Sequence, residues 1–237
     1  MEHYLEPYYP SLLNILSYEN EIHAIPYNNY VMGNHYRADL FEHPVEQANF
    51  IKRYGYPLAP PQTVQQLVDI GEFFTRGIGE QLADTKLTKQ FYGMALMSGL
   101  RPHINDEFSA ILWGLDGKWM TPIYKKNKLQ HFQVDSQNSA LVETTMFYQK
   151  LKQYAYPADS QFAFYESAQA MANGQVAMWP FAITTYGACH LKLNKISKAA
   201  NSKSRKSQAE NLITVLMLLP SAMTAKIHKL LIGYLNI

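Results

Sequence analysis

The residues best able to carry out chemistry are scattered along this 237-residue sequence and form no catalytic motif. Its eight histidines stand apart, and the single cysteine, Cys189, rules out an internal disulfide and a cysteine-based metal site. No G-x-S-x-G, H-E-x-x-H or P-loop motif occurs, and the glycines Gly77 and Gly79 are too few to cradle a phosphate. The sequence therefore predicts no catalytic residue, cofactor or metal. Two of its 19 acidic residues could still pair as a carbohydrate-active enzyme requires.

Composition indicates a folded chain rich in aromatic residues. Hydrophobic residues make up 47% and charged residues 17% of the sequence, which is typical of globular proteins. The length suits one large domain or two small ones. The 17 tyrosines suit a surface that binds polar ligands, and they suit an ordinary core equally well. No apolar run long enough to span a membrane occurs, and the N-terminus lacks the basic and apolar regions of a secretory signal.

The net charge of +2 hides an asymmetry along the chain. The last 50 residues carry eight Lys or Arg and one acid, which leaves 13 basic and 18 acidic residues in the first 187. Residues 192–206 are basic and polar and could attract nucleic acid or anionic lipid. Because they lack interleaved aromatic residues, nucleic acid is not predicted as a partner. We interpret residues 1–187 as one mildly acidic region, followed by a separate tail.

Apolar periodicity predicts alternating strands and helices in the first 187 residues. Strands are expected at residues 21–27, 30–36, 91–96, 118–123 and 176–179, with Pro180 ending the last. Helices are expected at residues 37–41, 44–53, 63–74, 107–115, 136–154 and 160–173. Pro44 and Gly55 are typical of a helix start and end, Thr63 of an N-cap, and Gly174 of a helix stop. Residues 125–128 are expected to form a solvated, charged loop.

Strands that alternate with helices indicate an α/β sheet with crossover connections. Such sheets place ligands at the connections that follow the strands. This prediction puts three segments at one rim, namely residues 27–30, 92–94 and 179–181. The tryptophans Trp113 and Trp119 are assigned to the core.

Five phrases in the first 187 residues carry a family resemblance. They are AIPY at 24–27, YRADLFEHP at 36–44, YGYPLAPPQTVQQLVDIGEFFTR at 54–76, FYGMAL at 91–96 and FYESAQAMANGQVAMWPF at 164–181. Their order and spacing resemble those of the extracellular solute-binding proteins, family 1, of ABC sugar importers. The resemblance ends before residue 188, because the family's next strand and its glycine-rich crossover have no counterpart in the tail.

The resemblance implies a periplasmic-binding-protein-like (type II) α/β fold, with two lobes joined by hinge crossovers and mostly the C-lobe present. Residues 1–36 would be a remnant of the N-lobe with the first crossover, 37–178 the C-lobe, 179–187 the second crossover and 188–237 an unrelated tail. The implied function is capture of a mono- or oligosaccharide by lobe closure and its delivery to the transmembrane subunits of an ABC permease. The parent protein would be monomeric and periplasmic, or extracellular and attached to the membrane.

Because the match begins in the middle of the family's fold, we expect the chain to be a fragment. The tail is then interpreted as the product of a disrupted or frame-shifted gene. Two functional alternatives stay open at this point: a carbohydrate-active enzyme with a close carboxylate pair, and a truncated product that binds nothing.

Sugar chemistry suggests which residues would bind. Aromatic rings cover the apolar faces of a sugar, whereas amides and carboxylates pair with its hydroxyl groups. By the resemblance, Trp179 matches the aromatic residue that follows the family's GkvAM phrase, here GQVAM at 174–178, and is expected to stack on the ligand, with a core role as the alternative. Glu107 is expected either to bind a hydroxyl or to favour the first turn of its helix. The predicted ligand-binding residues are Asn28, Asn29, Tyr30, Tyr92, Glu107, Trp179 and Phe181.

Overall fold

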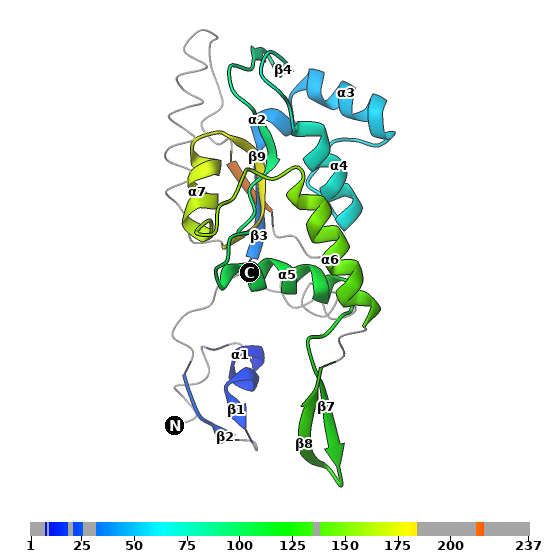
Figure 1. Ribbon diagram of the computed structural model, residues 1–237, viewed down its shortest axis with the longest axis vertical. Coiled ribbons are helices and arrows are strands. Elements are labelled where there is room, and N and C mark those ends of the chain that lie inside the picture. Colours follow the sequence, from blue (N-terminus) through cyan, green and yellow to red (C-terminus); the bar gives the residue numbers. More distant parts are fainter. Residues whose placement is uncertain are drawn as a thin grey trace. The chain divides into compact units, whose positions relative to one another are not determined.

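The computed structural model describes residues 8, 10–18, 21–25, 32–134, 138–183 and 212–215 of the chain (Figure 1). The chain divides into two compact units, Met1–Val31 and Met32–Ile237. The strand predicted at residues 30–36 corresponds to β3, Met32–Arg37, which is the first strand of the second unit. The assignment of residue ranges to lobes stays a prediction.

The first unit contains a short helix and a small hairpin. Helix α1 spans Pro10–Ile15 and is followed by strands β1, Ser17–Tyr18, and β2, Glu21–Ile22, which pair antiparallel. The hydroxyl of Ser17 caps this helix by donating to the Leu13 carbonyl at 2.6 Å. The strand predicted at 21–27 is therefore described only as β2, and residues 26–31 lie outside the described part of the chain.

The second unit is built on a four-stranded sheet of order β10-β3-β9-β6. These strands span Met32–Arg37 (β3), Tyr92–Met94 (β6), Val176–Ile183 (β9) and Leu212–Val215 (β10). Strand β9 runs antiparallel to β3 and parallel to β6, while β10 pairs antiparallel with β3. Four residues of the predicted separate tail therefore belong to the same sheet as β3.

Strand β9 continues through Pro180, so the prediction that this proline ends the strand is wrong. The register explains why. Trp179 pairs with His35 and Ala182 pairs with Gly33, so Pro180 and Phe181 of β9 face the single residue Asn34 of β3. This is a β-bulge, and β6 has already ended opposite Met178. A proline, which lacks an N–H, is tolerated at such a position because no ladder hydrogen bond is lost.

Helices cover the two faces of the sheet (Figure 1). Helix α7, Phe164–Ala172, packs on one face of β9, and its buried neighbours form a cluster with Met97, Val176 and Trp179. The other face is covered by α4 (Val64–Phe74), α5 (His103–Gly114) and α6 (Ser139–Lys152), whose buried residues join Met94 and Met178 in the larger core cluster. Helices α2, Ala38–Phe41, and α3, Pro44–Tyr54, follow β3. Both faces of the sheet are thus buried, as a mostly apolar strand such as β9 requires.

Local signals located several helix ends. Helix α3 begins at Pro44 and ends before Gly55, whose φ of 81° supplies the left-handed conformation of a C-cap. The Thr63 hydroxyl accepts from the Gln66 N–H at 3.1 Å, so it is the N-cap of α4 as predicted. Other starts were misplaced: α5 begins at His103, α6 is capped by the Asn138 side chain, and α7 begins at Phe164. We found no helix among the described residues that is long and apolar enough to cross a bilayer.

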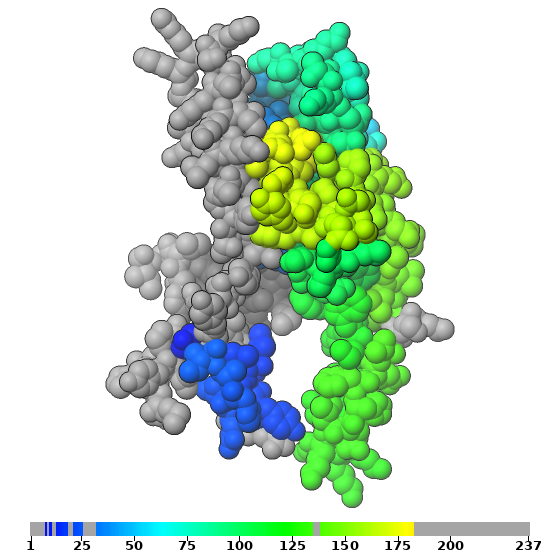
Figure 2. All heavy atoms as spheres, turned by 60° about the vertical axis from the view of Figure 1, so that its left-hand side comes forward, coloured from blue at the N-terminus to red at the C-terminus, as the bar shows by residue number. Residues whose placement is uncertain are grey.

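Strands β7, Thr121–Lys125, and β8, Lys128–Gln133, form a hairpin that projects beyond α5 and α6 (Figures 1 and 2). The predicted charged loop at 125–128 is its tight turn. Lys126 and Asn127 both have positive φ, 48° and 61°, which is the pattern of a two-residue type I′ hairpin turn. The second strand was missed because alternation is broken by a register shift after Ile123. A smaller hairpin consists of β4, Gln81–Leu82, and β5, Thr85–Lys86.

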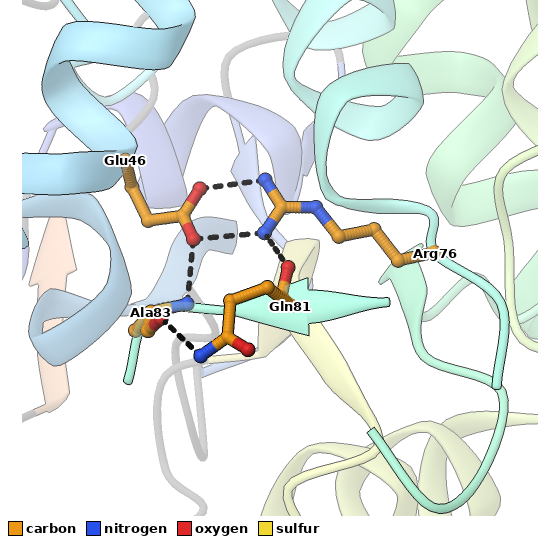
Figure 3. Close-up of polar contacts among 4 residues, drawn as sticks. All are labelled: Glu46, Arg76, Gln81 and Ala83. Carbon is orange, nitrogen blue, oxygen red and sulfur yellow. Dashed lines mark hydrogen bonds and ion pairs between the residues drawn. The ribbon is translucent and has the colours of Figure 1, made fainter. Parts of the chain in front are cut away.

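A buried ion pair ties helix α3 to the small β4–β5 hairpin (Figure 3). The guanidinium of Arg76 donates to both carboxylate oxygens of Glu46, at 2.8 and 2.6 Å, and to the Gln81 carbonyl at 2.8 Å. The Ala83 N–H donates to Glu46 Oε1 at 2.6 Å. The Glu46 side chain is only 2% exposed and that of Arg76 12%, so the pair is shielded from water.

Candidate functional site

Strand β6 ends at one edge of the sheet, where the parallel strand β9 continues past it. Tyr92 lies opposite Val176 and Met94 opposite Met178, so β6 ends beside the middle of β9. The chain then runs through residues 95–102 into α5, while β9 continues to Ile183. Connections that leave this edge of an α/β sheet are the usual place for ligands. We call residues 95–102 the rim segment.

The rim segment is held by backbone hydrogen bonds to the chain before α7. The N–H of Gly99 donates to the Phe162 carbonyl at 2.8 Å, and that of Leu100 donates to the Ser160 carbonyl at 2.9 Å. A Cβ on Gly99 would lie 2.3 Å from the Phe162 oxygen, which is closer than real contacts allow. Glycine is therefore required here for close approach of two backbones.

Glu107 of α5 anchors the start of the rim segment. Its Oε1 accepts from the Met97 N–H at 2.7 Å and its Oε2 accepts from the Tyr148 hydroxyl of α6 at 2.8 Å. The residue is fully buried. Burial raises the pKa of Glu107 to about 8, although these two hydrogen bonds act in the opposite direction. Burial also raises the pKa of Tyr148, and the adjacent Glu107 adds to that rise. Glu107 thus holds protein groups with both of its oxygens.

Aromatic side chains extend from the buried sheet toward the rim. The Trp179 ring lies edge-on to His35, with centroids 5.9 Å apart, and 5.3 Å from the Phe164 ring. Phe164 in turn stacks on the ring of His103, the first residue of α5, and the two ring centroids are 6.1 Å apart. Trp179 and His35 are buried, whereas Phe164 and His103 are half-buried. The next residue of α7, Tyr165, is 55% exposed. Flat apolar surface is therefore present beside the rim segment.

Two buried polar groups at the bulge have no hydrogen-bond partner among the residues that the structure describes. Both the Nδ2 and the Oδ1 of Asn34 are unpaired, and Asn34 is fully buried. Trp179 lies opposite His35, the next residue of β3, in the strand register. Its Nε1 likewise has no hydrogen-bond partner among the described residues. Leaving such a group unpaired costs about 1–3 kcal/mol, so each one requires an explanation.

The structure separates the predicted ligand-binding residues into several environments. Tyr92 lies at the start of β6, edge-on to Tyr156 at 5.3 Å, and not beside residues 179–181 as predicted, because it is paired with Val176. Phe181 is buried in the larger core cluster at the bulge. Trp179 is fully buried, in contact with core residues of α7, and Glu107 is engaged as described above. Asn28, Asn29 and Tyr30 lie outside the described residues. Contact of any of these residues with a ligand stays a prediction.

Three residues of this region were not predicted to bind. Asn34 interrupts the apolar alternation of residues 30–36, and that interruption is the available sequence signal. His103 and Phe164 carried no distinctive signal, because their proximity depends on how α5 and α7 pack at the same end of the sheet. Within the described ranges, no group of three or more His, Cys, Asp or Glu side chains is placed to hold a metal ion.

Comparisons with known proteins give a likeness in fold. Neither a protein-family model nor a curated protein matches the sequence. Among solved structures, the chain is similar to an ABC transporter solute-binding protein from Agrobacterium vitis S4 with bound D-mannitol. The TM-score is 0.53 and the identity 16%, over 88% of this chain and 41% of that one.

A second similar structure is an ABC transporter solute-binding protein from Thermotoga lettingae TMO bound with alpha-D-tagatose. Here the TM-score is 0.50 and the identity 18%, over 97% of this chain and 55% of that one. This chain thus spans about half the length of these two proteins. The predicted α/β fold class, that of solute-binding proteins, is confirmed.

Proposed function

We propose that this chain supplies one half of the sugar-binding site of a solute-binding protein that serves an ABC importer. The ligand is a monosaccharide, an oligosaccharide or a related polyol, and the partners are the importer's transmembrane subunits. Binding takes place outside the inner membrane, without catalysis. The fold likeness supports this class of function, since the two similar structures hold D-mannitol and alpha-D-tagatose.

The observation that carries the proposal is the pair of unpaired buried groups at the β3–β9 bulge. The Asn34 amide has two donors and an acceptor to offer, and the Trp179 indole has one donor. Because side chains alternate along β3, Asn34 lies on the opposite face of the sheet from His35 and its partner Trp179. A hydroxyl group of the bound sugar would satisfy one of these groups, and a water that the sugar orders would satisfy the other. The rings of Phe164 and Tyr165 at the start of α7 would cover an apolar ring face. Closure of a second lobe over this edge would exclude water and strengthen these hydrogen bonds.

The rim segment would be the rigid part of this half-site. Glu107 and the backbone bonds from Gly99 and Leu100 would hold its geometry before the ligand binds. Preorganisation of this kind raises affinity because less ordering is lost on binding. Glu107 is thus proposed to position the rim segment, in place of the direct hydroxyl contact expected from the sequence.

A ligand titration of the purified 237-residue chain tests the proposal. D-mannitol, D-tagatose and a panel of mono- and disaccharides are added while thermal stability and tryptophan fluorescence are recorded. We expect a saturable shift with at least one of them. Asn34→Leu should abolish that shift, because the pairing groups are gone. The same substitution should leave thermal stability equal or higher, because an unsatisfied polar group is removed.

Two further variants sharpen the titration. Trp179→Phe keeps the buried ring but removes the N–H, and the loss of one ligand hydrogen bond should weaken binding about tenfold. Tyr92→Phe, at the opposite end of β6, is the matched control and should bind as the wild type does. Wild-type affinity in Asn34→Leu would contradict the proposed site. A cooperative melt with no shift from any ligand would contradict binding by this chain alone.

The enzymatic alternative gains no support from the two buried glutamates. Glu46 is neutralised by Arg76, and Glu107 accepts from Met97 and Tyr148. Neither is therefore available as a general acid or base toward a sugar in this structure.

A further inference from the structure

The β7–β8 hairpin has one apolar face that is open to solvent. Its register pairs Pro122 with Phe132 and Tyr124 with Leu129, and the register shift between these pairs leaves Gln130 unpaired. Because side chains alternate along a strand, these four residues share one face, which we call the apolar face. Tyr124 is 62%, Phe132 55% and Leu129 44% exposed, and Pro122 is exposed as well. Solvent-exposed apolar groups clustered in this way mark an interaction site.

The rest of the hairpin is cationic. Lys125 pairs with Lys128 next to the turn that contains Lys126, and Lys118 precedes the first strand. No Asp or Glu occurs from residue 117 to 134. His131 lies on the opposite face from the apolar residues, paired with Ile123. The hairpin therefore combines an apolar face with an uncompensated positive charge near its tip.

The hairpin is attached to α5 at its base but is not part of the main sheet. Trp119 was assigned to the core, yet it is 38% exposed and fastens the base of the hairpin to α5. Its Nε1 donates to the Ser109 hydroxyl at 2.8 Å, and its ring lies 5.3 Å from that of Phe108. Strands β7 and β8 pair only with each other among the described strands, and their ribbon extends beyond α5 and α6 in Figure 1.

We propose that this hairpin binds the surface of an anionic lipid bilayer. The apolar face would lie in the boundary between headgroups and acyl chains, with Tyr124 at the level where aromatic residues are favoured. Lys125 and its partner Lys128 lie on the same face as Ile123, opposite the apolar face. Their long side chains, with those of Lys126 in the turn and Lys118 before the first strand, would reach acidic headgroups around the edges of the hairpin. This inference is independent of the sugar-binding proposal.

Charge and composition favour a lipid surface over other occupants. A second copy of this hairpin would bring like charges together, and lysine is depleted at the core of protein interfaces. Single-stranded nucleic acid would stack on Tyr124 and Phe132 but would leave the aliphatic Pro122 and Leu129 unused. A bilayer accommodates both the aliphatic and the cationic groups.

Co-sedimentation of the full chain with phosphatidylcholine vesicles, with and without phosphatidylglycerol, tests this proposal. We expect the wild type to bind only the anionic vesicles and to be released by high salt. Removal of a lysine weakens partitioning about fivefold, so Lys125→Gln with Lys128→Gln should weaken it about 25-fold. Tyr124→Ser with Phe132→Ser should also abolish most binding. Ile123→Ser, on the opposite face, is the matched control and should sediment as the wild type does.

The outcomes separate the hairpin from other parts of the chain. The hairpin lies outside the core clusters, so all variants should melt as the wild type does. Vesicle binding that survives Tyr124→Ser with Phe132→Ser would overturn the proposal and point to the basic stretch at 192–206. Equal binding to neutral vesicles, or binding only to an oligonucleotide probe, would also overturn it. So would a dimer in light scattering that the same double variant dissociates.

Discussion

Glu46 and Glu107 are both buried glutamates on helices of the second unit, yet their environments push their pKa values in opposite directions. Burial raises the pKa of each. At Glu46 the hydrogen bonds from Arg76 and Ala83 and the charge of Arg76 outweigh burial and lower the pKa below its usual value. At Glu107 the donors are a backbone N–H and a hydroxyl, and burial prevails. Of these two buried carboxyl groups, the one that faces a full positive charge has its pKa lowered, whereas the one that faces neutral donors has its pKa raised.

The two sites also hold different parts of the fold. Glu46 joins α3 to the β4–β5 hairpin, whereas Glu107 joins α5 and α6 to the rim segment at the candidate site. The charged site is expected to give the larger stability effect, because removal of one partner leaves an uncompensated charge. The neutral site should instead control local geometry.

The largest effect is expected from Arg76→Leu. It leaves Glu46 buried without its counter-ion, which should lower the free energy of unfolding by about 3–5 kcal/mol at neutral pH. Urea unfolding followed by circular dichroism measures this change. The double variant Glu46→Leu with Arg76→Leu should recover much of the loss, because no charge stays buried. A loss under about 1 kcal/mol in the single variant would mean that the Glu46–Arg76 pair is no stronger than a surface pair. It would contradict the expected difference in stability effect between Glu46 and Glu107.

An intermediate effect is expected from Glu107→Ala. The Met97 N–H and the Tyr148 hydroxyl lose their acceptor, which should lower the free energy of unfolding by about 1–3 kcal/mol and add a cavity cost. Glu107→Gln keeps an acceptor for the Met97 N–H, so it should lower the free energy of unfolding by less. Hydrogen exchange of the rim segment should speed up in Glu107→Ala and stay near wild type in Glu107→Gln. Equal losses in both variants would show that charge, and not hydrogen bonding, matters at this position.

The pH dependence of stability should separate the two glutamates. The pKa of Glu107 rises from 4.5 in the unfolded chain to about 8, so its folded form binds more protons. Its contribution is complete below 4.5 and is lost as pH rises toward 8, with a slope of at most about 1.4 kcal/mol per pH unit. The pKa of Glu46 is lowered, so its contribution is present above 4.5 and is lost as pH falls through its folded pKa.

Glu107→Gln should therefore flatten the loss of stability between pH 4.5 and 8 and leave the acid limb unchanged. Denaturant unfolding over a series of pH values measures both limbs. A Glu107→Gln profile that still declines over that window would assign the decline to another group.

The smallest effect is expected from Arg53→Met. Arg53 donates to Glu72, but the two side chains are 51% and 39% exposed, so water screens the pair. The substitution should change the free energy of unfolding by less than about 1 kcal/mol. It is the exposed control for Arg76→Leu in the same unfolding assay. A loss as large as that of Arg76→Leu would show that exposure does not distinguish the two arginines.

Local sequence signals predicted the elements well where a few neighbouring residues suffice. Pro44 and Gly55 bounded α3, Thr63 capped α4 and Gly174 followed α7, because capping and left-handed φ depend on the residue and its neighbours within one turn. The apolar run at 176–179 was identified as a buried strand because a short apolar run is also a local signal. The failures at Pro180 and in the β7–β8 hairpin are both positions where the strand itself is bulged, with Pro180 in β9 and Gln130 in β8.

The candidate site was less predictable. Trp179 was expected at the end of a strand, but it lies within β9, and its full burial depends on α7 and on His35 of a strand about 140 residues earlier. Tyr92 was assigned to the wrong end of the sheet, because strand register is set by pairing and not by composition. Glu107 could not be recognised as an anchor, since Tyr148 lies on another helix.

The amino-acid sequence alone was enough for the α/β class and most helix boundaries, because propensity, capping and periodicity act over short distances. The charge state of a buried glutamate, the bulge that admits Pro180 and the solvent-exposed apolar face of the hairpin were settled by the folded arrangement. Each of these depends on groups from separate elements, such as Glu46 and Arg76, which are 30 residues apart. Solvent exclusion and strand register arise only when those elements pack together, and no window of sequence contains them.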